Sequence, residues 1–363
     1  MDWTTGFLDV ISLRLLPLIV NTSFVFMGCI TALVFCLLLI KVTAVLWETD
    51  ISNAKKWILP VFEKHLDDPA QQLPVRFLKM RWPLRRVLQY VIVHRSFGET
   101  GEKLGNIARA YEALGFVDGD FRRMRSPFWW VRAEAARCLG QMKASRAKNE
   151  LLLNLKDSVT EVRLVSAWAL GRIGEADAIQ PILDSLVKAS KLAGMRLSST
   201  VFELGEKAVQ PLISALKHQA PDVKILALHL LGELNDKKAV PHIIVKAKSK
   251  ENLEVRLAAY KALGTIADSS AGSFLIKSLK DPSWQVRAQA ARGLGIIGSD
   301  DAIPRLCGTL DDPKWWVRRN SGEALIKTGE KGKAALLSIL RSAPSSPGGR
   351  MAAQWLDEYG YLP

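Results

Sequence analysis

The sequence predicts an all-α protein: a right-handed α-solenoid of stacked helix pairs, preceded by a single transmembrane helix. Two observations carry most of this prediction, namely one charge-free apolar run near the N-terminus and one short phrase that recurs along the rest of the chain. Composition agrees, because 48% apolar and 24% charged residues over 363 positions are typical of a folded protein and not of a disordered one.

The first element is the apolar run Leu15–Ile40, which has 26 consecutive residues without a charge. A helix of about 20 apolar residues crosses a bilayer, so this run is long enough and leaves some length for tilt. A cleaved signal peptide is the alternative, but it requires a basic start, whereas Asp2 and Asp9 stand here against a lone Arg14. We predict a retained single-pass anchor within residues 1–47.

Flanking charge predicts the orientation of this anchor. Lysines follow the span, and the acid-free stretch 69–98 then contains six Lys and Arg residues. The positive-inside rule therefore places the N-terminus outside a bacterial inner membrane and everything after residue 47 in the cytoplasm, with Trp47 at the headgroup level. The net charge of +14 also indicates a negatively charged neighbour, such as nucleic acid, an anionic membrane or an acidic protein.

The second element, residues 48–118, is a basic juxtamembrane region. We expect "ISNAKKWILPVFEKHLDD" to be helical with a break or kink at Pro60, while "VRFLKMRWPLRRVLQYVIVHR" alternates basic clusters with apolar residues. Near an anionic leaflet each Lys or Arg gains about 1 kcal/mol, so this segment is predicted to contact lipid headgroups or a helix of a membrane partner. A buried amphipathic helix with a solvated basic edge is the plainer alternative. The predicted contact residues are Arg76, Lys79, Arg81, Trp82, Arg85 and Arg86.

The third element, residues 119–363, is a set of repeats. The phrases "WWVRAEAARCLG", "EVRLVSAWALG", "EVRLAAYKALG" and "QVRAQAARGLG" align on Val-Arg and on the Leu-Gly that follows. The positions equivalent to the arginine recur every 27 to 34 residues: Arg132, Arg163, Leu197, Lys224, Arg256, Arg287 and Arg318. A period of this length indicates a stack of small supersecondary units.

Each unit reads as two helices. The first has small and apolar residues at helical spacing, and the second follows in phrases such as "DAIQPILDSLVK" and "DAIPRLCGTL". Asp-Pro steps at Asp281 and Asp312 suit the start of the next unit. We expect a glycine to close the first helix at its C′ position in six copies: Gly140, Gly171, Gly205, Gly232, Gly264 and Gly295.

These phrases resemble the short bacterial HEAT-like repeat first associated with phycobilisome lyases, over about residues 120–363. The resemblance implies that the Asp and Arg of successive repeats pair in a ladder along the solenoid, and that tryptophans cover the joint between repeats. On this basis Trp129, Trp284 and Trp315 are expected to be stacking residues. The ladder residues so predicted are Arg132, Arg163, Arg256, Asp281, Arg287, Asp312 and Arg318.

Two copies depart from the pattern. The third has Leu197 in place of the arginine, which could bend the superhelix or open a groove. The last has Leu325-Ile326 where the others have Leu-Gly, as an end repeat might, and "RMAAQWLDEYGYLP" is expected to cap it.

The sequence predicts no catalytic, cofactor-binding or metal site, and hence no enzyme. The five histidines are isolated, no phosphate-binding or nucleophile motif occurs, and the four cysteines are scattered. The absence of His-Glu pairs separates the chain from di-iron hydroxylases built on HEAT repeats.

Three functions remain in view. The first is a membrane-anchored cytoplasmic scaffold that binds a protein partner, expected to be an integral membrane protein, within an inner-membrane complex such as a polysaccharide-synthesising glycosyltransferase or a secretion or signalling assembly. The second is nucleic-acid binding, which is disfavoured because the repeat arginines are expected to pair with aspartates of the ladder and not with phosphates. The third is a lyase-like enzyme, disfavoured because fold does not carry function.

Overall fold

A computed structural model describes residues 16–67, 73–80, 84–186, 198, 200–249 and 252–361. Throughout these ranges the regular structure is helical and contains no strand. The chain divides into two compact units, residues 1–116 and 117–363. Several residues named above lie outside the described ranges: Asp2, Asp9, Arg14, Leu15, Arg81, Trp82 and Leu197.

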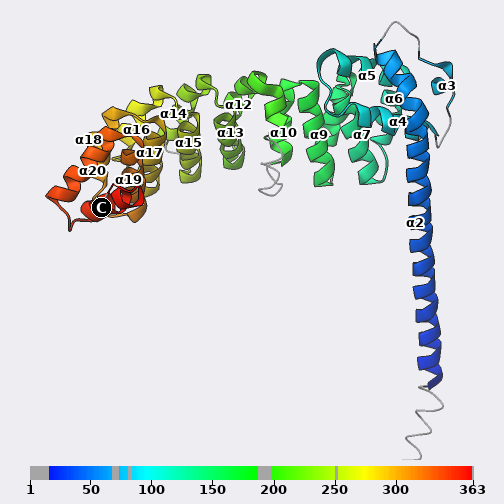
Figure 1. The fold of residues 1–363 in the computed structure, drawn as a ribbon, viewed down its shortest axis with the longest axis horizontal. Coiled ribbons are helices and arrows are strands. Elements are labelled where there is room, and N and C mark those ends of the chain that lie inside the picture. The colour runs from blue at the N-terminus through cyan, green and yellow to red at the C-terminus, as the bar shows by residue number, and fades with distance from the viewer. Residues whose placement is uncertain are drawn as a thin grey trace, which may run out of the picture. The chain divides into compact units, whose positions relative to one another are not determined.

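The first unit begins with one long helix, α2 (Leu16–Asp67), of 52 residues (Figure 1). Its apolar part, Val20–Leu46, has a mean hydropathy of 2.7, and all of its side chains are exposed. The hydroxyl of Thr43 donates to the carbonyl of Leu39, 2.8 Å away, which satisfies a polar group within the apolar stretch. The helix is long and apolar enough to cross a membrane.

The second half of α2 belongs to a small core. The helix continues through Pro60 without a break, because Ile58 and Phe62 on either side of it are fully buried. Helix α2 packs with α4 (Leu84–Arg95) and α5 (Gly101–Ala113), and its Trp57 lies beside Phe77 of α3 (Val75–Leu78). These helices contribute buried residues such as Phe77, Leu88 and Ile107. The residues that follow the apolar span are therefore part of a folded helical core.

The second unit consists of helix pairs that form two rows, one of long and one of short helices (Figure 1). The long helices are α7 (Trp129–Gln141), α9 (Thr160–Ile173), α13 (Pro221–Leu234), α15 (Leu253–Ile266), α17 (Trp284–Ile297) and α19 (Trp315–Lys327). The short helices are α8 (Lys148–Asn154), α10 (Ile179–Leu186), α12 (Val209–Ala215), α14 (Val240–Lys248), α16 (Gly272–Ser278) and α18 (Ile303–Thr309).

Single 3-10 turns lead into the short helices, and further helices stand at the ends of the row. The 3-10 turns are Ser145–Ala147, Ala176–Ala178, Gly205–Ala208, Lys237–Ala239, Ser269–Ala271 and Asp300–Ala302. The end helices are α6 (Phe116–Arg123), α20 (Glu330–Ser342) and α21 (Pro347–Glu358). Each 3-10 turn ends in a fully or almost fully buried alanine.

The recurring glycines do not close the long helices, so the C′ prediction is wrong for five of the six. Gly140, for example, lies inside α7, and Gly295 lies inside α17, which ends two residues later. The residues in the left-handed conformation at the helix ends are others, including Ala267 (φ 52°) and Gly298 (φ 71°). Of the six predicted glycines, Gly205 has a positive φ.

Close packing between neighbouring long helices explains these glycines. A Cβ atom on Gly295 would lie 2.7 Å from the Cα of Ala324, and one on Gly140 would lie 2.6 Å from the Cα of Ala169. Contacts this short are not tolerated, so the missing side chain lets adjacent backbones approach closely. Glycine therefore sets the spacing of the row.

The C-terminal phrase forms a helix that covers the last repeat. Within α21, Trp355 is only 3% exposed, and its indole Nε1 donates to the carbonyl of Arg319, 3.1 Å away. Its ring lies where a Cβ on Gly322 would come within 2.3 Å. The helix thus buries the otherwise open flank of α19.

Candidate interaction surfaces

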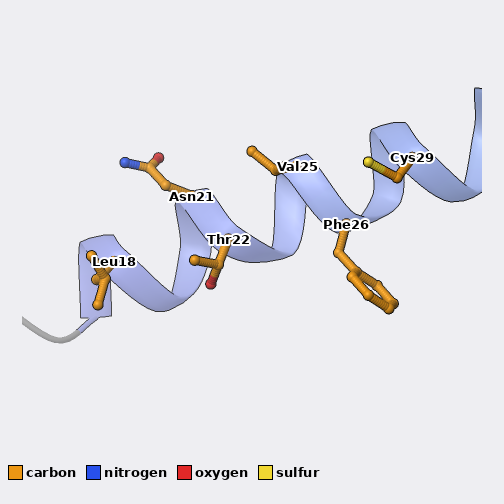
Figure 2. Close-up of a pocket in the computed structure, with 6 residues that line it drawn as sticks. All are labelled: Leu18, Asn21, Thr22, Val25, Phe26 and Cys29. Atoms are coloured by element: carbon orange, nitrogen blue, oxygen red, sulfur yellow. The ribbon is translucent and has the colours of Figure 1, made fainter.

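The apolar half of α2 presents its side chains outward. Figure 2 shows six of them, which line a shallow depression along one side of the helix: Leu18, Asn21, Thr22, Val25, Phe26 and Cys29. All six are exposed. A depression formed by one helix alone does not enclose a ligand, whereas the large exposed apolar area suits a lipid environment or another helix.

The predicted basic contact residues have different roles where the structure describes them. Arg76 is exposed, and its guanidinium lies 5.2 Å from the ring centre of Trp57. Lys79 and Arg86 are exposed. Arg85 instead donates to the carbonyl of Leu114 and lies 4.8 Å from the ring of Phe116. Three of these basic side chains are thus presented at the surface, while Arg85 makes internal contacts.

An Arg–Asp arrangement joins successive repeats in the second unit. Arg287 reaches Asp312 of the next repeat through two hydrogen bonds, Nε to Oδ2 at 2.7 Å and Nη2 to Oδ1 at 3.0 Å. Its remaining nitrogen, Nη1, donates to the carbonyls of Asp281 and Pro282 in its own turn. Asp312 in turn accepts from the backbone nitrogen of Lys314 at 2.8 Å. One arginine therefore links its own turn to the following one.

Arg132 pairs with Asp157 in the same way, at 2.7 and 2.8 Å. Arg256 makes a single hydrogen bond to Asp281, at 2.6 Å, and its Nε donates to the carbonyl of Ala247. Burial alone would raise the pKa of the Asp157 carboxyl, but the hydrogen bonds from Arg132 and from the Val159 backbone outweigh it, so this pKa is lowered. The ionised carboxylate is thus the stable form in the folded repeat.

The arrangement has interruptions. Arg163 donates to the carbonyls of Asp157 and Ser158, and Arg318 to those of Asp312 and Pro313. The position 25 residues further on, where the other arginines find an aspartate, is Lys188 for the first and Ala343 for the second. Both arginines bind main-chain carbonyls of their own turns, as Arg132 and Arg287 also do, and Arg163 donates in addition to the hydroxyl of Thr160.

The expectation that the tryptophans are stacking residues is wrong for the Trp-Trp pairs. Trp129 and Trp315 each expose 43% of their surface, and their neighbours Trp130 and Trp316 expose 54% and 51%. The rings of each pair contact one another edge-on. Trp284 is half-buried.

Comparison with protein families decides what these repeats are. The sequence model of HEAT repeats matches residues 121–193, 209–282 and 272–356, which is more than half of the chain. The chain belongs to the HEAT-repeat family. A comparison with curated proteins found no match.

Solved structures are similar to this chain at low identity. Human deoxyhypusine hydroxylase in complex with glycerol is 18% identical, over 86% of this chain and 98% of that one, with a TM-score of 0.30. The CpcE–CpcF phycocyanin lyase complex from Nostoc is 20% identical over 68% and 94%, with a TM-score of 0.29. A Kap121p mutant is 13% identical over 77% and 38%, with a TM-score of 0.46. These likenesses concern the fold alone.

A second set of ion pairs links the HEAT repeats at the opposite ends of their helices, in the turns that lead from a long helix to a short one. Lys148 lies 2.8 Å from Asp177 of the next repeat, and Lys237 lies 3.3 Å from Asp268. Lys331 pairs with Asp300 in the same way. Sequence reasoning missed these pairs, although Lys and Asp or Glu do recur in these turns.

The HEAT repeats offer little for covalent chemistry. Burial, together with the nearby negative charges of Asp120 and Glu134, raises the pKa of the Cys138 thiol to about 12. Burial also raises the pKa of Cys307. Both thiols are therefore protonated and weakly nucleophilic at neutral pH. Within the described ranges no three His, Cys, Asp or Glu side chains are grouped as metal ligands.

Proposed function

We propose that this protein is a membrane-anchored HEAT-repeat scaffold, whose apolar N-terminal helix spans a bacterial inner membrane and whose repeats bind a protein partner in the cytoplasm. The observation that carries the proposal is the helix α2: its 27-residue apolar stretch Val20–Leu46 has no protein covering it, and a folded core follows directly. Leaving so much apolar surface in water would be unfavourable, at roughly 25 cal/mol per Å².

The charge distribution supports the orientation. The surface-exposed Arg76, Lys79 and Arg86 follow the span, in agreement with the positive-inside rule. The partner is proposed to be an integral membrane protein of an inner-membrane complex, such as a polysaccharide-synthesising glycosyltransferase or a secretion or signalling assembly. A row of repeats presents many surface positions to such a partner without a reaction centre.

The two other functions have less support. Nucleic-acid binding would need free arginines, and Arg132, Arg256 and Arg287 are bound to aspartates. A lyase using a cysteine nucleophile would need a thiolate, which the raised pKa of Cys138 opposes.

The anchor is tested by fractionating the full-length protein from membranes with alkaline carbonate. We expect it in the pellet, and we expect Leu33→Arg/Leu38→Arg to release it, because each central charge costs about 2.5–3.5 kcal/mol of insertion free energy. The matched control is Leu153→Arg/Val245→Arg, since these two side chains are equally exposed but lie in the repeats. Release of the unsubstituted chain, or equal release of both variants, would contradict the anchor.

The orientation and the scaffold role are tested on the same preparation. Protease added to spheroplasts should leave the repeats intact, whereas digestion of them would contradict the cytoplasmic placement. Purification in a gentle detergent should recover a defined membrane protein in stoichiometric amount, and the chain purifying alone would contradict the scaffold.

A further inference from the structure

The two edges of the HEAT-repeat row differ in charge. At one edge lie the turns from long to short helices, where lysines such as Lys148, Lys237 and Lys331 pair with carboxylates of the neighbouring repeat. At the other edge lie the turns from short to long helices, here named the return edge. Its aspartates Asp157 and Asp312 are bound by ladder arginines, one to one. These two aspartates therefore do not neutralise other basic residues at the return edge, where the exposed acidic residues Asp222 and Glu254 also lie, in the first turns of α13 and α15.

Basic residues recur at one equivalent position in successive return turns. A buried apolar residue lies within one position of the end of the helix that precedes each return turn, and the residue after it is basic and exposed in five of the six described turns. These residues are Arg125, Lys156, Lys217, Lys248 and Lys280, and in the sixth turn the position is Asp311. Arg125 pairs with Glu150. For Lys156, Lys217 and Lys280 the described part of the chain supplies no carboxylate partner.

The exposed aromatic pairs belong to this same edge. Trp129 and Trp130 begin α7, and Trp315 and Trp316 begin α19, so each pair directly follows a return turn. Phe128, beside the first pair, is 53% exposed and stacks on Trp130 at 4.8 Å. The return edge thus carries a line of lysines with aromatic side chains near both of its ends.

We propose that the return edge docks on an anionic bilayer surface. Neighbouring helices pack about 10 Å apart, so the basic residues form a line of separate point charges that suits a diffuse negative surface. Lysines on flexible stems demand no fixed geometry from their partner, whereas a folded acidic partner would be better matched by forked arginines in a groove. Tryptophan side chains favour the headgroup region, which accounts for their exposure here. The proposal rests on the proposed anchor, which would tether the chain to the membrane.

The experiment uses the full-length protein in nanodiscs of phosphatidylcholine, with or without added phosphatidylglycerol, and follows amide hydrogen exchange by mass spectrometry. Co-migration of the chain with the discs is verified first. If the chain does not insert into the discs, the proposed anchor is contradicted. If it inserts but the return turns gain no protection from anionic lipid, only the docking proposal is contradicted. We expect exchange in the return turns around Lys156, Lys280 and Trp315 to slow at least ~tenfold when anionic lipid is present.

Two triple variants separate the edges. Lys156→Gln/Lys217→Gln/Lys280→Gln should abolish the lipid-dependent protection. Lys143→Gln/Lys207→Gln/Lys238→Gln should keep it, because these exposed lysines lie in the opposite turns and their replacement removes the same charge.

A further arm adds polyglutamate to discs of neutral lipid, as a probe for an acidic polypeptide. Protection that arises with polyglutamate and not with phosphatidylglycerol would overturn the proposal in favour of a protein partner. No protection in any arm, or equal loss in both triple variants, would also overturn it.

Discussion

Replacing Arg287 with Ala should destabilise the repeats around it by about 3 kcal/mol. The substitution removes two hydrogen bonds to Asp312 and two to the carbonyls of Asp281 and Pro282. It also leaves the Asp312 carboxylate, only 8% exposed, with one backbone donor. Removing one partner of a buried pair costs roughly 3–5 kcal/mol, and the 14% exposure of the Arg287 side chain places this pair at the lower end.

The measurement is native-state hydrogen exchange of α17 and α19 in the full-length protein, because repeat arrays open locally as well as globally. Arg292→Ala is the matched control, since this arginine lies exposed on the same helix and should cost less than about 0.5 kcal/mol. Arg318→Ala, which loses only main-chain acceptors, should cost about 1 kcal/mol. If Arg287→Ala and Arg292→Ala had equal effects, the linking role of the pair would be refuted.

Three further outcomes are expected in unfolding experiments on the same protein. Gly295→Ala should cost about 1–3 kcal/mol because its Cβ would strike the next helix, while Gly308→Ala, with open space around it, should be neutral or stabilising; the reverse order would contradict the packing role. The lowered pKa of Asp157 means that its stabilisation is present above its unfolded pKa near 3.8 and is lost as pH falls through the folded value; acid titration should show this loss, and Asp157→Asn should lack it. Trp355→Ala should cost about 3–5 kcal/mol in urea unfolding because the ring is buried, whereas exposed Trp316→Ala should cost under about 1 kcal/mol; equal costs would contradict the cap.

The period of the repeats could be predicted from the sequence because each helix pair must bury the same positions. Residues such as Val286 and Leu294 recur at helical spacing and are fully buried, so their pattern predicts both the helices and their stacking. The apolar span was readable for the opposite reason, since 26 residues without a charge have few structural uses other than a membrane.

The packing role of the recurring glycines could not be predicted from the neighbouring residues in the sequence. A glycine near the end of a helical pattern suits a left-handed C′ residue and a close helix contact equally well. The choice depends on which residue takes the left-handed conformation, and at the end of α15 this is Ala267, for which no local signal exists. The distance from Gly264 to the neighbouring Gly293 is a tertiary property.

The exposure of the tryptophans depended on tertiary geometry in a similar way. A large aromatic residue at the first helical position after a turn can lie over the joint or beside it. The side chains of Arg287 and Asp312 are largely buried, whereas Trp315 exposes 43% of its surface. Exposed aromatic area of this kind is unfavourable in water unless something covers it.

The positive charge of the return-edge lysines is not explained by stability. Ladder arginines such as Arg132 and Arg287 each have a carboxylate partner, so they contribute structure and little net charge. Lys156 and Lys280 stabilise no described carboxylate, and they recur although the fold does not require them; Asp311 holds the same position in the last turn. These lysines recur along one edge, and exposed tryptophans lie near its ends. A negatively charged surface outside the protein would explain both features. Because the chain also carries a membrane-length apolar helix, we propose that this surface is the bilayer.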